Sequence, residues 1–152
     1  MTKGKIRREV VTQRILWVRE MLAGIRALPT RTKEEFLRKR HHVAAAESYL
    51  RRALEALFDL GRHVLAKGFG LPYTEYKEVA RGLQETGVLD GQPAQLIERM
   101  AGYRNRMVHF YHELTADELY EICHDHLGEI EQVLDAMVEW CRREDVGGNR
   151  VD

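Results

Sequence analysis

The sequence predicts an all-α protein, an antiparallel bundle of about five helices. Apolar residues recur with the period of a helix almost throughout the chain. In one long segment they recur every seven residues, a spacing that suits the packing of antiparallel helices. No run alternates as a strand does, and no repeat or linker divides the 152 residues. We expect one domain over residues 1–145 and a flexible C-terminal tail over 146–152, which has little to bury.

The first two expected helices are separated by Pro29 and Thr30. The first has an inward stripe of Ile15, Val18, Leu22 and Ile25. Thr32 and Glu35 have the spacing of a capping box, which opens a second, long helix that ends at Gly68 and Gly70. Its inward residues are Phe36, Val43, Leu50, Leu57 and Val64, joined by Leu54 and Gly61.

The other three helices are expected between further turn signals. The third begins after Thr74 and ends at Gly87; Pro93 suits the first turn of the fourth. Thr115 and Glu118 form another capping box, so the fourth helix ends before residue 115 and a fifth follows. The inward residues are Tyr76, Val79, Ala80 and Leu83, then Leu96, Met100, Tyr103 and Met107, then Leu119, Ile122, Ile130, Val133 and Met137.

Composition and cysteine usage predict a soluble cytoplasmic protein. Charged residues make up 32% of the chain and cancel to a net charge of zero, so no overall positive field attracts nucleic acid. Cys123 and Cys141 fall in the fifth expected helix, about 27 Å apart along a straight helix, which is beyond the reach of a disulfide. No apolar run approaches the length of a transmembrane helix, and the basic N-terminus lacks a signal-peptide core.

The residues that indicate a chemical function lie between Arg104 and Tyr111, in the stretch Arg-Asn-Arg-Met-Val-His-Phe-Tyr. Arginine binds phosphate through a planar fork of donors, and histidine transfers protons near neutral pH. Together, Arg104 and His109 indicate cleavage of a phosphodiester without a metal or other cofactor. RNA is the favoured substrate because its 2′-hydroxyl is an internal nucleophile, and a cyclic 2′,3′-phosphate with a 5′-hydroxyl is the expected product pair.

On one straight helix these two side chains cannot reach the same phosphate. Arg104 and Tyr111 lie within about 20° of each other around an ideal helix, whereas His109 lies about 140° from Arg104. Two arrangements remain open. Either the helix loosens near His109, or two copies of the helix face each other and line one cleft.

The same stretch, with its surroundings, resembles the HepT family of HEPN-domain ribonuclease toxins. That family carries Arg-x4-His-x-Tyr, which matches Arg104, His109 and Tyr111, with a polar residue after the arginine, here Asn105. Residues 49–65 resemble the long central helix of the family, and residues 70–76 and 83–89 resemble its connecting segments. The resemblance runs from about residue 40 to residue 138.

The resemblance implies a HEPN-like fold, a homodimer with both motifs at the interface, and an endoribonuclease toxin. Arg104 would stabilise charge on phosphorus, and His109 would act as general acid or base. Asn105 would orient Arg104 or bind the substrate backbone, and Arg106 would contribute a phosphate contact. In systems similar to HepT–MntA, a separate nucleotidyltransferase antitoxin transfers AMP onto the motif tyrosine. Tyr111 is therefore the expected AMPylation site, and RNA, an MntA-like antitoxin and a second copy are the expected partners.

Other interpretations of single features are weaker. Histidines suggest a metal site at His41-His42 and in the set His109, His112, His124 and His126, yet no carboxylate or cysteine cluster joins them, so we expect no metal. Arg38-Lys39-Arg40 and Arg51-Arg52 could follow an RNA strand, although charged helix faces are more often only solvated. Trp17 and Trp140 are expected in the core.

Two other functional classes remain open from the sequence alone. The chain could be a non-catalytic helical module that binds a nucleotide or a partner nucleotidyltransferase. It could also be a purely structural dimerisation module. Only the toxin hypothesis predicts that loss of the His109 imidazole abolishes toxicity while the fold remains intact.

Overall fold

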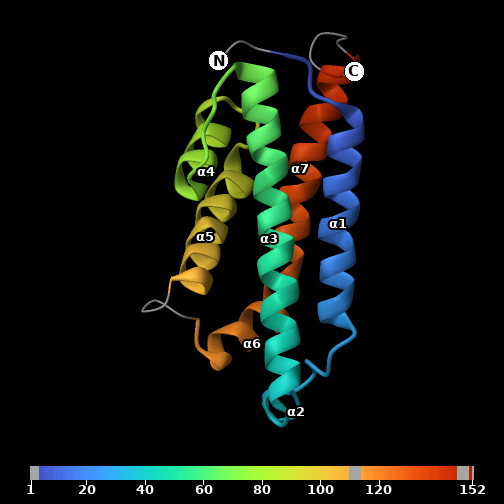
Figure 1. Cartoon of the computed structure of the whole chain (residues 1–152), viewed down its shortest axis with the longest axis vertical. Helices are drawn as coiled ribbons and strands as arrows, with labels where there is room; N and C mark the ends of the chain where they lie inside the picture. Colours follow the sequence, from blue (N-terminus) through green and yellow to red (C-terminus); the bar gives the residue numbers. More distant parts are fainter. Residues whose placement is uncertain (1–3, 110–113, 147–150, 152) are drawn as a thin grey trace.

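The computed structural model describes residues 4–109, 114–146 and 151, and this part of the chain contains seven helices. They are α1 (Arg8–Arg26), α2 (Lys33–Leu37), α3 (Arg40–Phe69), α4 (Tyr76–Glu85), α5 (Gly91–Val108), α6 (Ala116–Asp125) and α7 (Leu127–Val146). In Figure 1, α1 and α5 run downward and α3 and α7 run upward, so the four longest helices form an antiparallel bundle. The all-α prediction is confirmed.

One apolar core runs the length of this bundle, and most of the predicted inward residues belong to it. In α3 the heptad positions Leu50, Leu57 and Val64 are fully buried, and Val43 is half-buried near the start of the helix. Trp140 is buried on α7, as expected, but the prediction for Trp17 is wrong. Its side chain is 43% exposed, because the buried stripe of α1 passes through its neighbour Val18 and leaves Trp17 at the edge of the α1–α3 groove.

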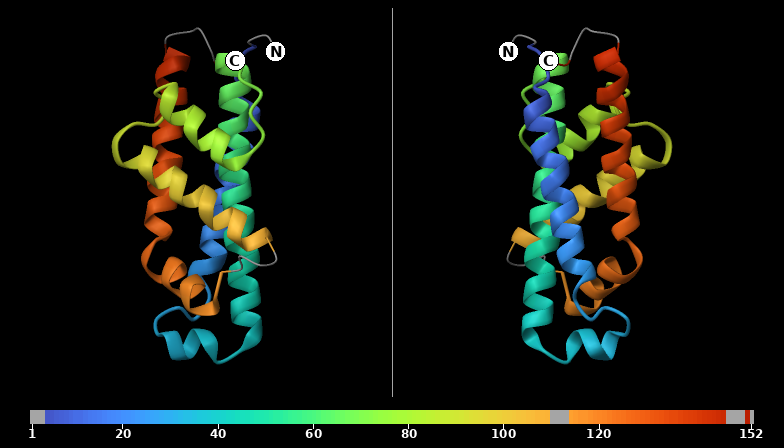
Figure 2. Two further views of the ribbon diagram at one scale, coloured as in Figure 1. Left: turned by 90° about the vertical axis from the view of Figure 1, so that its left-hand side faces the viewer. Right: turned by 90° about the vertical axis from the view of Figure 1, so that its right-hand side faces the viewer.

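The predicted second helix is two helices, which is the first correction to the count of five. Thr32 caps as expected, accepting a hydrogen bond from the backbone N–H of Glu35 at 3.2 Å. The helix then ends after Leu37, and Lys39 is extended (φ −125°, ψ 132°) before α3 begins. Figure 2 shows α2 lying across the lower end of the bundle. This turn buries Phe36, whose ring centroid lies 5.5 Å from that of Tyr120 on α6.

The predicted fifth helix is also two, α6 and α7. Thr115 and Glu118 form the expected capping box at its start. His126 interrupts the helix (φ −121°, ψ 7°), and its Nδ1 atom lies 3.0 Å from Oε2 of Glu129 in the first turn of α7. Cys123 and Cys141 therefore lie on different helices, not on one. Both are free and buried, and burial raises the pKa of Cys123 to about 12 and that of Cys141 to about 11.

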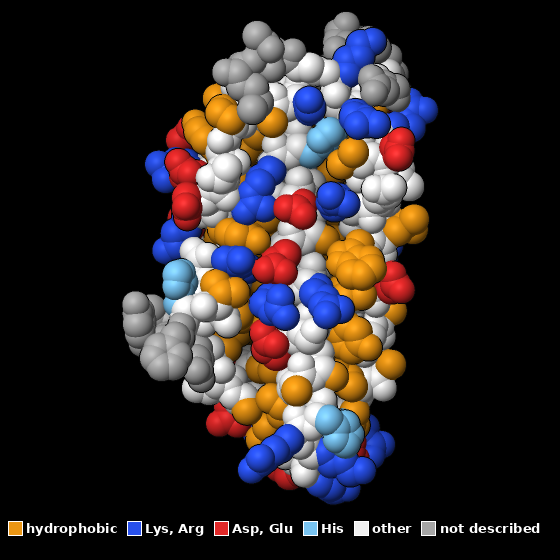
Figure 3. Space-filling model, viewed as in Figure 1, with side chains coloured by type: hydrophobic (Ala, Val, Ile, Leu, Met, Phe, Trp, Pro, Cys, Tyr) orange, Lys and Arg blue, Asp and Glu red, His pale blue; other side chains and the backbone are white. Residues whose placement is uncertain are grey.

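Acidic and basic side chains alternate along α3 in the middle of the face shown in Figure 3. This pattern reflects ion pairs one helical turn apart, such as Arg51 with Glu47 and Glu55, and Arg62 with Asp59. Such pairs contribute about 0.3–0.5 kcal/mol each on a helix surface. Their larger effect here is to hold guanidinium groups in fixed positions beside α4 and α5.

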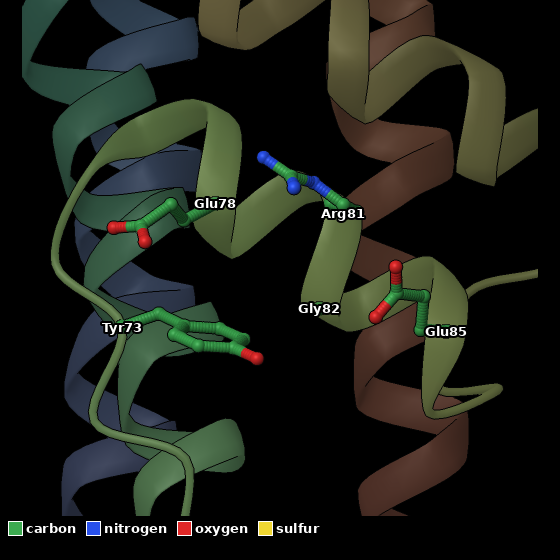
Figure 4. Close-up of a pocket in the computed structure, with 5 residues that line it drawn as sticks. All are labelled: Tyr73, Glu78, Arg81, Gly82 and Glu85. Carbon is green, nitrogen blue, oxygen red and sulfur yellow. The ribbon is translucent and has the colours of Figure 1, made fainter.

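Two glycines allow α3 and α4 to approach closely. A methyl group on Gly61 of α3 would lie 3.0 Å from Leu83 Cδ1 and 3.1 Å from Val79 Cγ1. A methyl group on Gly82 of α4 would lie 2.9 Å from Leu65 Cδ1 and 2.9 Å from the ring of Tyr73. Figure 4 shows the Tyr73 ring directed toward α4 at the small hollow that Gly82 lines. The close contact fixes α4 and its first residue, Tyr76, against α3.

The two ends of the described chain meet at the upper end of the bundle (Figure 1). Ile6 is fully buried and forms an isolated parallel bridge with Val151. Residues 147–150 and 152, most of the expected tail, lie outside the described residues. In the part of the chain that the structure describes, no helix is both long and apolar enough to span a membrane.

Replacing Gly82 with alanine should destabilise the fold. The added methyl group displaces Leu65 and Tyr73, and overpacking of this kind costs about 1–3 kcal/mol, more than the gain in helix propensity of roughly 0.5–1 kcal/mol. Chemical denaturation of Gly82→Ala measures the change. Gly102→Ala on α5 is the matched control, because nothing lies within 4 Å of its added methyl group; it should be neutral or stabilising. Equal stability of the two variants would contradict close α3–α4 packing.

Candidate functional site

Arg104 projects from α5 into the junction of α3, α4 and α5. Its side chain is only 22% exposed, and its Nη2 atom donates to Oε2 of Glu55 at 3.3 Å. The guanidinium carbon lies 4.1 Å from the centroid of the Tyr76 ring, a cation–π distance. A carboxylate and an aromatic face therefore fix this arginine from two directions.

Glu55 links Arg104 to the charged face of α3. Its second oxygen, Oε1, accepts a hydrogen bond from Arg51 at 3.4 Å, and Arg51 also bonds Glu47 at 3.2 Å. Arg51, predicted as part of a possible RNA track, is thus paired on both sides. The row of alternating charges connects the lower half of α3 to Arg104.

The ring of Tyr76 lies at the centre of this junction and contacts residues of the neighbouring helices. Its ring centroid lies 4.9 Å from that of buried Phe58 on α3. A second guanidinium, Arg62, lies 4.6 Å from the ring centroid. Arg62 also donates to the carbonyl oxygen of Thr74 at 3.0 and 2.7 Å, which fixes the chain just before α4. The orientation of Tyr76, and with it that of Arg104, depends on packing among three helices.

His109 lies immediately after the last residue of α5. Its backbone N–H still bonds the carbonyl of Asn105 at 3.1 Å, but its own backbone is extended (φ −94°, ψ 113°). The side chain is exposed and lines a hollow of about 340 Å³ with Lys77, Gly102, Asn105 and Arg106. The helix thus ends at His109, as in the first of the two arrangements that the sequence left open.

The structure does not join Arg104 and His109 in one hollow. The guanidinium of Arg104 is held against Glu55 and Tyr76, whereas His109 borders the hollow that Asn105 and Arg106 line. Asn105 and His109 line the same hollow. The predicted cleft between two copies of the chain stays a prediction.

Arg106 is engaged with the start of α6. It forms an ion pair with Glu118 at 2.8 Å, and the hydrogen bond from Arg106 lowers the pKa of the Glu118 carboxyl. Glu118 also accepts from Thr115 in the capping box. Glu118 thus connects the end of α5 to the beginning of α6, the two helices that flank the C-terminal half of the motif.

Tyr111 and His112 lie outside the described residues, so the structure places neither the expected modification site nor one of the histidines considered as metal ligands. The imidazoles of His124 and His126 lie against the carboxylates of Asp125 and Glu129. No group of three potential metal ligands gathers among residues 4–109 and 114–146.

Sequence reasoning missed Glu55 and Lys77. Glu55 could have been noticed as the end of the Glu47–Arg51–Glu55 series, spaced at four residues. Its contact with Arg104, 49 residues away in sequence, depends on helix packing. Lys77 has no local signal, and only the position of α4 brings it beside His109.

Several solved structures share this fold. The HEPN toxin of Shewanella oneidensis, tri-AMPylated and in complex with an MNT antitoxin, superposes with a TM-score of 0.78 and 19% identity, covering 87% of this chain and 98% of that one. A toxin–antitoxin structure with AMP-PNP gives a TM-score of 0.76, 18% identity, and coverage of 86% and 98%. An MntA–HpeT toxin–antitoxin complex that carries a tyrosine-to-alanine mutation gives a TM-score of 0.72 and 18% identity, and the match covers 86% of this chain and 98% of that one.

A search of curated proteins finds no match. A family model described as Ribonuclease HepT-like, however, matches residues 18–137. That range includes the junction at Glu55, Tyr76 and Arg104 as well as His109 at the end of α5. The chain therefore belongs to the HepT-like ribonuclease family.

Proposed function

We propose that this protein is an endoribonuclease toxin that cleaves RNA without a metal and is silenced by a nucleotidyltransferase antitoxin. The observation that carries the proposal is the family match over residues 18–137, which contains an arginine and a histidine at the end of one helix. The likeness to HEPN toxins solved with MNT antitoxins supports the choice of partner.

In the proposed reaction His109 removes the proton of the 2′-hydroxyl or protonates the leaving 5′-oxygen. Its exposed position after the last turn of α5 gives it access to a bound strand. Arg104 stabilises the negative charge that develops on phosphorus. Asn105 and Lys77, which line the same hollow as His109, contact the substrate backbone.

Glu55 and Tyr76 orient Arg104 for this role. The contact with Glu55 uses Nη2, and Nη1 makes no hydrogen bond to any residue that the structure describes. An arginine carries five N–H donors in a planar fork, so Nη1 can bind a phosphate oxygen while Nη2 keeps the carboxylate. A fixed fork loses less conformational freedom on binding than a mobile one.

Arg104 and His109 lie apart within one protomer, but a homodimer can bring one of each together. Arg104 of one protomer and His109 of the other then line one composite cleft. The α1–α3 face offers a suitable interface, because the exposed ring of Trp17 lines a hollow there with Arg14, Arg52, Glu55 and Asp59. Arg14 pairs with Asp59 at 3.8 Å and Glu55 pairs with Arg51 and Arg104, so Trp17 and Arg52 are the groups that this hollow offers to the same surface of a second copy.

Replacing His109 with alanine should abolish growth inhibition and lower the RNA cleavage rate by about 10²–10⁴, the contribution typical of a general acid or base. Cleavage of total RNA by the purified protein, and colony counts after induction, measure both effects. His41→Ala is the matched control, since His41 is exposed at the start of α3, far along the chain from the motif. Undiminished cleavage by His109→Ala would refute the catalytic role.

Mixing two inactive variants tests the composite cleft. Co-expression of Arg104→Ala with His109→Ala rebuilds one complete site per heterodimer if each site takes its groups from both protomers. Random association makes about half of the dimers heterodimers, each with one complete site of two, so recovery of about a quarter of the wild-type cleavage is expected. No recovery, with a dimer confirmed by light scattering, would place both groups of a site in the same protomer.

The Glu55–Arg104 contact should stabilise the folded protein. A double-mutant cycle with Glu55→Gln, Arg104→Gln and the double variant isolates the pair from their other contacts. Because both side chains are largely covered, at 31% and 22% exposed, a coupling energy near the upper limit for surface pairs, about 1 kcal/mol, is expected from urea denaturation. A coupling energy indistinguishable from zero would mean that Glu55 does not hold Arg104.

The proposed silencing reaction is transfer of AMP from ATP to the hydroxyl of Tyr111, with release of pyrophosphate. Tyr111 follows His109 by two residues, so an attached AMP places bulk and negative charge beside the proposed phosphate site. RNA is then excluded both by volume and by repulsion between phosphates. The S. oneidensis toxin is tri-AMPylated in its complex.

Intact mass spectrometry should show one or more AMP additions when the protein is expressed with a neighbouring nucleotidyltransferase and none when it is expressed alone. Peptide fragmentation should place them on Tyr111, and Tyr111→Phe should stay unmodified and remain toxic beside the active partner. Addition at another tyrosine, such as Tyr103 or Tyr120, would contradict the assignment to the motif.

A non-catalytic module that binds a partner enzyme is the alternative function. The pairing of Arg104 with Glu55 favours it, because a neutralised arginine attracts phosphate less strongly. The two functions separate on the purified protein: the module binds the nucleotidyltransferase but leaves RNA intact.

A further inference from the structure

A basic cluster, Arg38, Lys39 and Arg40, occupies the junction of α2 and α3. All three side chains are exposed. Lys39 is the extended residue between the two helices, and Arg40 opens α3. Figure 3 shows Lys and Arg side chains gathered at this lower end of the molecule. The chain has no net charge, so the positive charge of this end is a local feature.

The cluster differs from most arginines of the protein in having no ion-pair partner within residues 4–109 and 114–146. Neighbouring cations are paired: Arg31 with Glu35 at 3.0 Å, and Lys33 with Asp117 at 3.7 Å. Residues 31–40 hold five cations and two carboxylates. The first turn of α3 contains no acidic residue, although the helix dipole favours acids there and disfavours cations. No ion pair among the described residues compensates for the unfavourable interaction between these cations and the helix dipole.

An apolar hollow adjoins the cluster between α3 and α6. It measures about 450 Å³ and is lined by Leu37, Arg40, Val43, Ala44, Glu47, Leu114, Ala116 and Leu119. Glu47, its one carboxylate, already pairs with Arg51. Leu114 and Ala116 belong to the stretch that leads from the motif to α6. The hollow is therefore bordered on one side by the basic cluster and on the other by the chain that follows His109.

We propose that the basic cluster and this hollow bind single-stranded RNA next to the cleavage site, with phosphates on Arg38, Lys39 and Arg40 and an unstacked base in the hollow. This inference rests on the proposed function. Uncompensated cations fit a polyanion, and sequence-tolerant RNA binding combines phosphate contacts with burial of splayed-out bases. Arg40 precedes Glu55 by fifteen residues on α3, which is about 22 Å along the helix, so a strand of several nucleotides held by the cluster can extend to the proposed site.

Fluorescence anisotropy with a short labelled 2′-fluoro RNA, which lacks the nucleophilic hydroxyl and so is not cleaved, measures binding by the full chain. The triple variant Arg38→Gln, Lys39→Gln, Arg40→Gln should bind on the order of tenfold more weakly, and the slope of log affinity against log salt should fall by about 2, or about 0.7 per lost phosphate contact. The matched control is Lys5→Gln, Arg81→Gln, Arg143→Gln, which changes net charge equally at exposed sites elsewhere. It should retain wild-type affinity.

A second pair of variants tests the hollow. Ala44 is exposed and lines it, so Ala44→Glu and Ala44→Gln place side chains of nearly equal size there, one charged and one neutral. Ala44→Glu should weaken RNA binding more than Ala44→Gln. Equal affinities would remove the hollow from the binding surface. Thermal unfolding of each variant confirms that the fold is retained.

The outcomes separate this inference from the proposed function. If the wild-type protein cleaves RNA but the cluster variant binds as tightly as wild type, or the control loses as much affinity, the inference is wrong and the proposed function stands. If the wild-type protein neither binds nor cleaves RNA, both fail. Loss of co-purification with the nucleotidyltransferase, at unchanged RNA affinity, would assign the surface to a protein partner and overturn the inference.

Discussion

The close approach of α3 and α4 is the constraint on which the candidate site depends. Gly61 and Gly82 leave no room for a side chain between these helices, and the contact they allow presses Tyr76 against Phe58. Tyr76 then carries the guanidinium of Arg104, which comes from a third helix. The site is thus positioned by packing of small against large residues from three helices.

Ion pairs organise most of the charged surface, and the exceptions are informative. Along α3, Glu47, Arg51 and Glu55 alternate in sign and share hydrogen bonds, and Glu55 also pairs with Arg104 of α5. Such a row holds arginines in place without a net field, which agrees with the zero net charge of the chain. Arg38, Lys39 and Arg40 depart from the pattern at one end of the bundle. Charge that is locally unbalanced in a balanced protein points to an external anion more strongly than the same residues would in a basic one.

The sequence predicted the helices well where apolar period and capping agreed, and poorly where a helix turns a corner. Thr115 with Glu118, Pro93 and Gly87 marked real boundaries. The breaks at Lys39 and His126 carry no glycine or proline; they form because Phe36 and the α6 stripe gain burial by folding across the end of the bundle, which is a tertiary effect. Likewise, Arg104 and His109 are candidates because they belong to a motif embedded in a longer resemblance. The contacts of Arg104 with Glu55 and Tyr76 could not be predicted, because they join residues 49 and 28 positions apart in sequence.

The packing of α5 against α7 makes the covering of the motif helix depend on a helix that is synthesised after it. The helix that carries the motif is translated before α7, and part of its apolar surface is covered by α7. A nascent chain therefore holds the arginine and histidine before it holds the helix that supports them. The apolar surface that α5 turns toward α7 is therefore exposed until α7 has been synthesised and has packed against it.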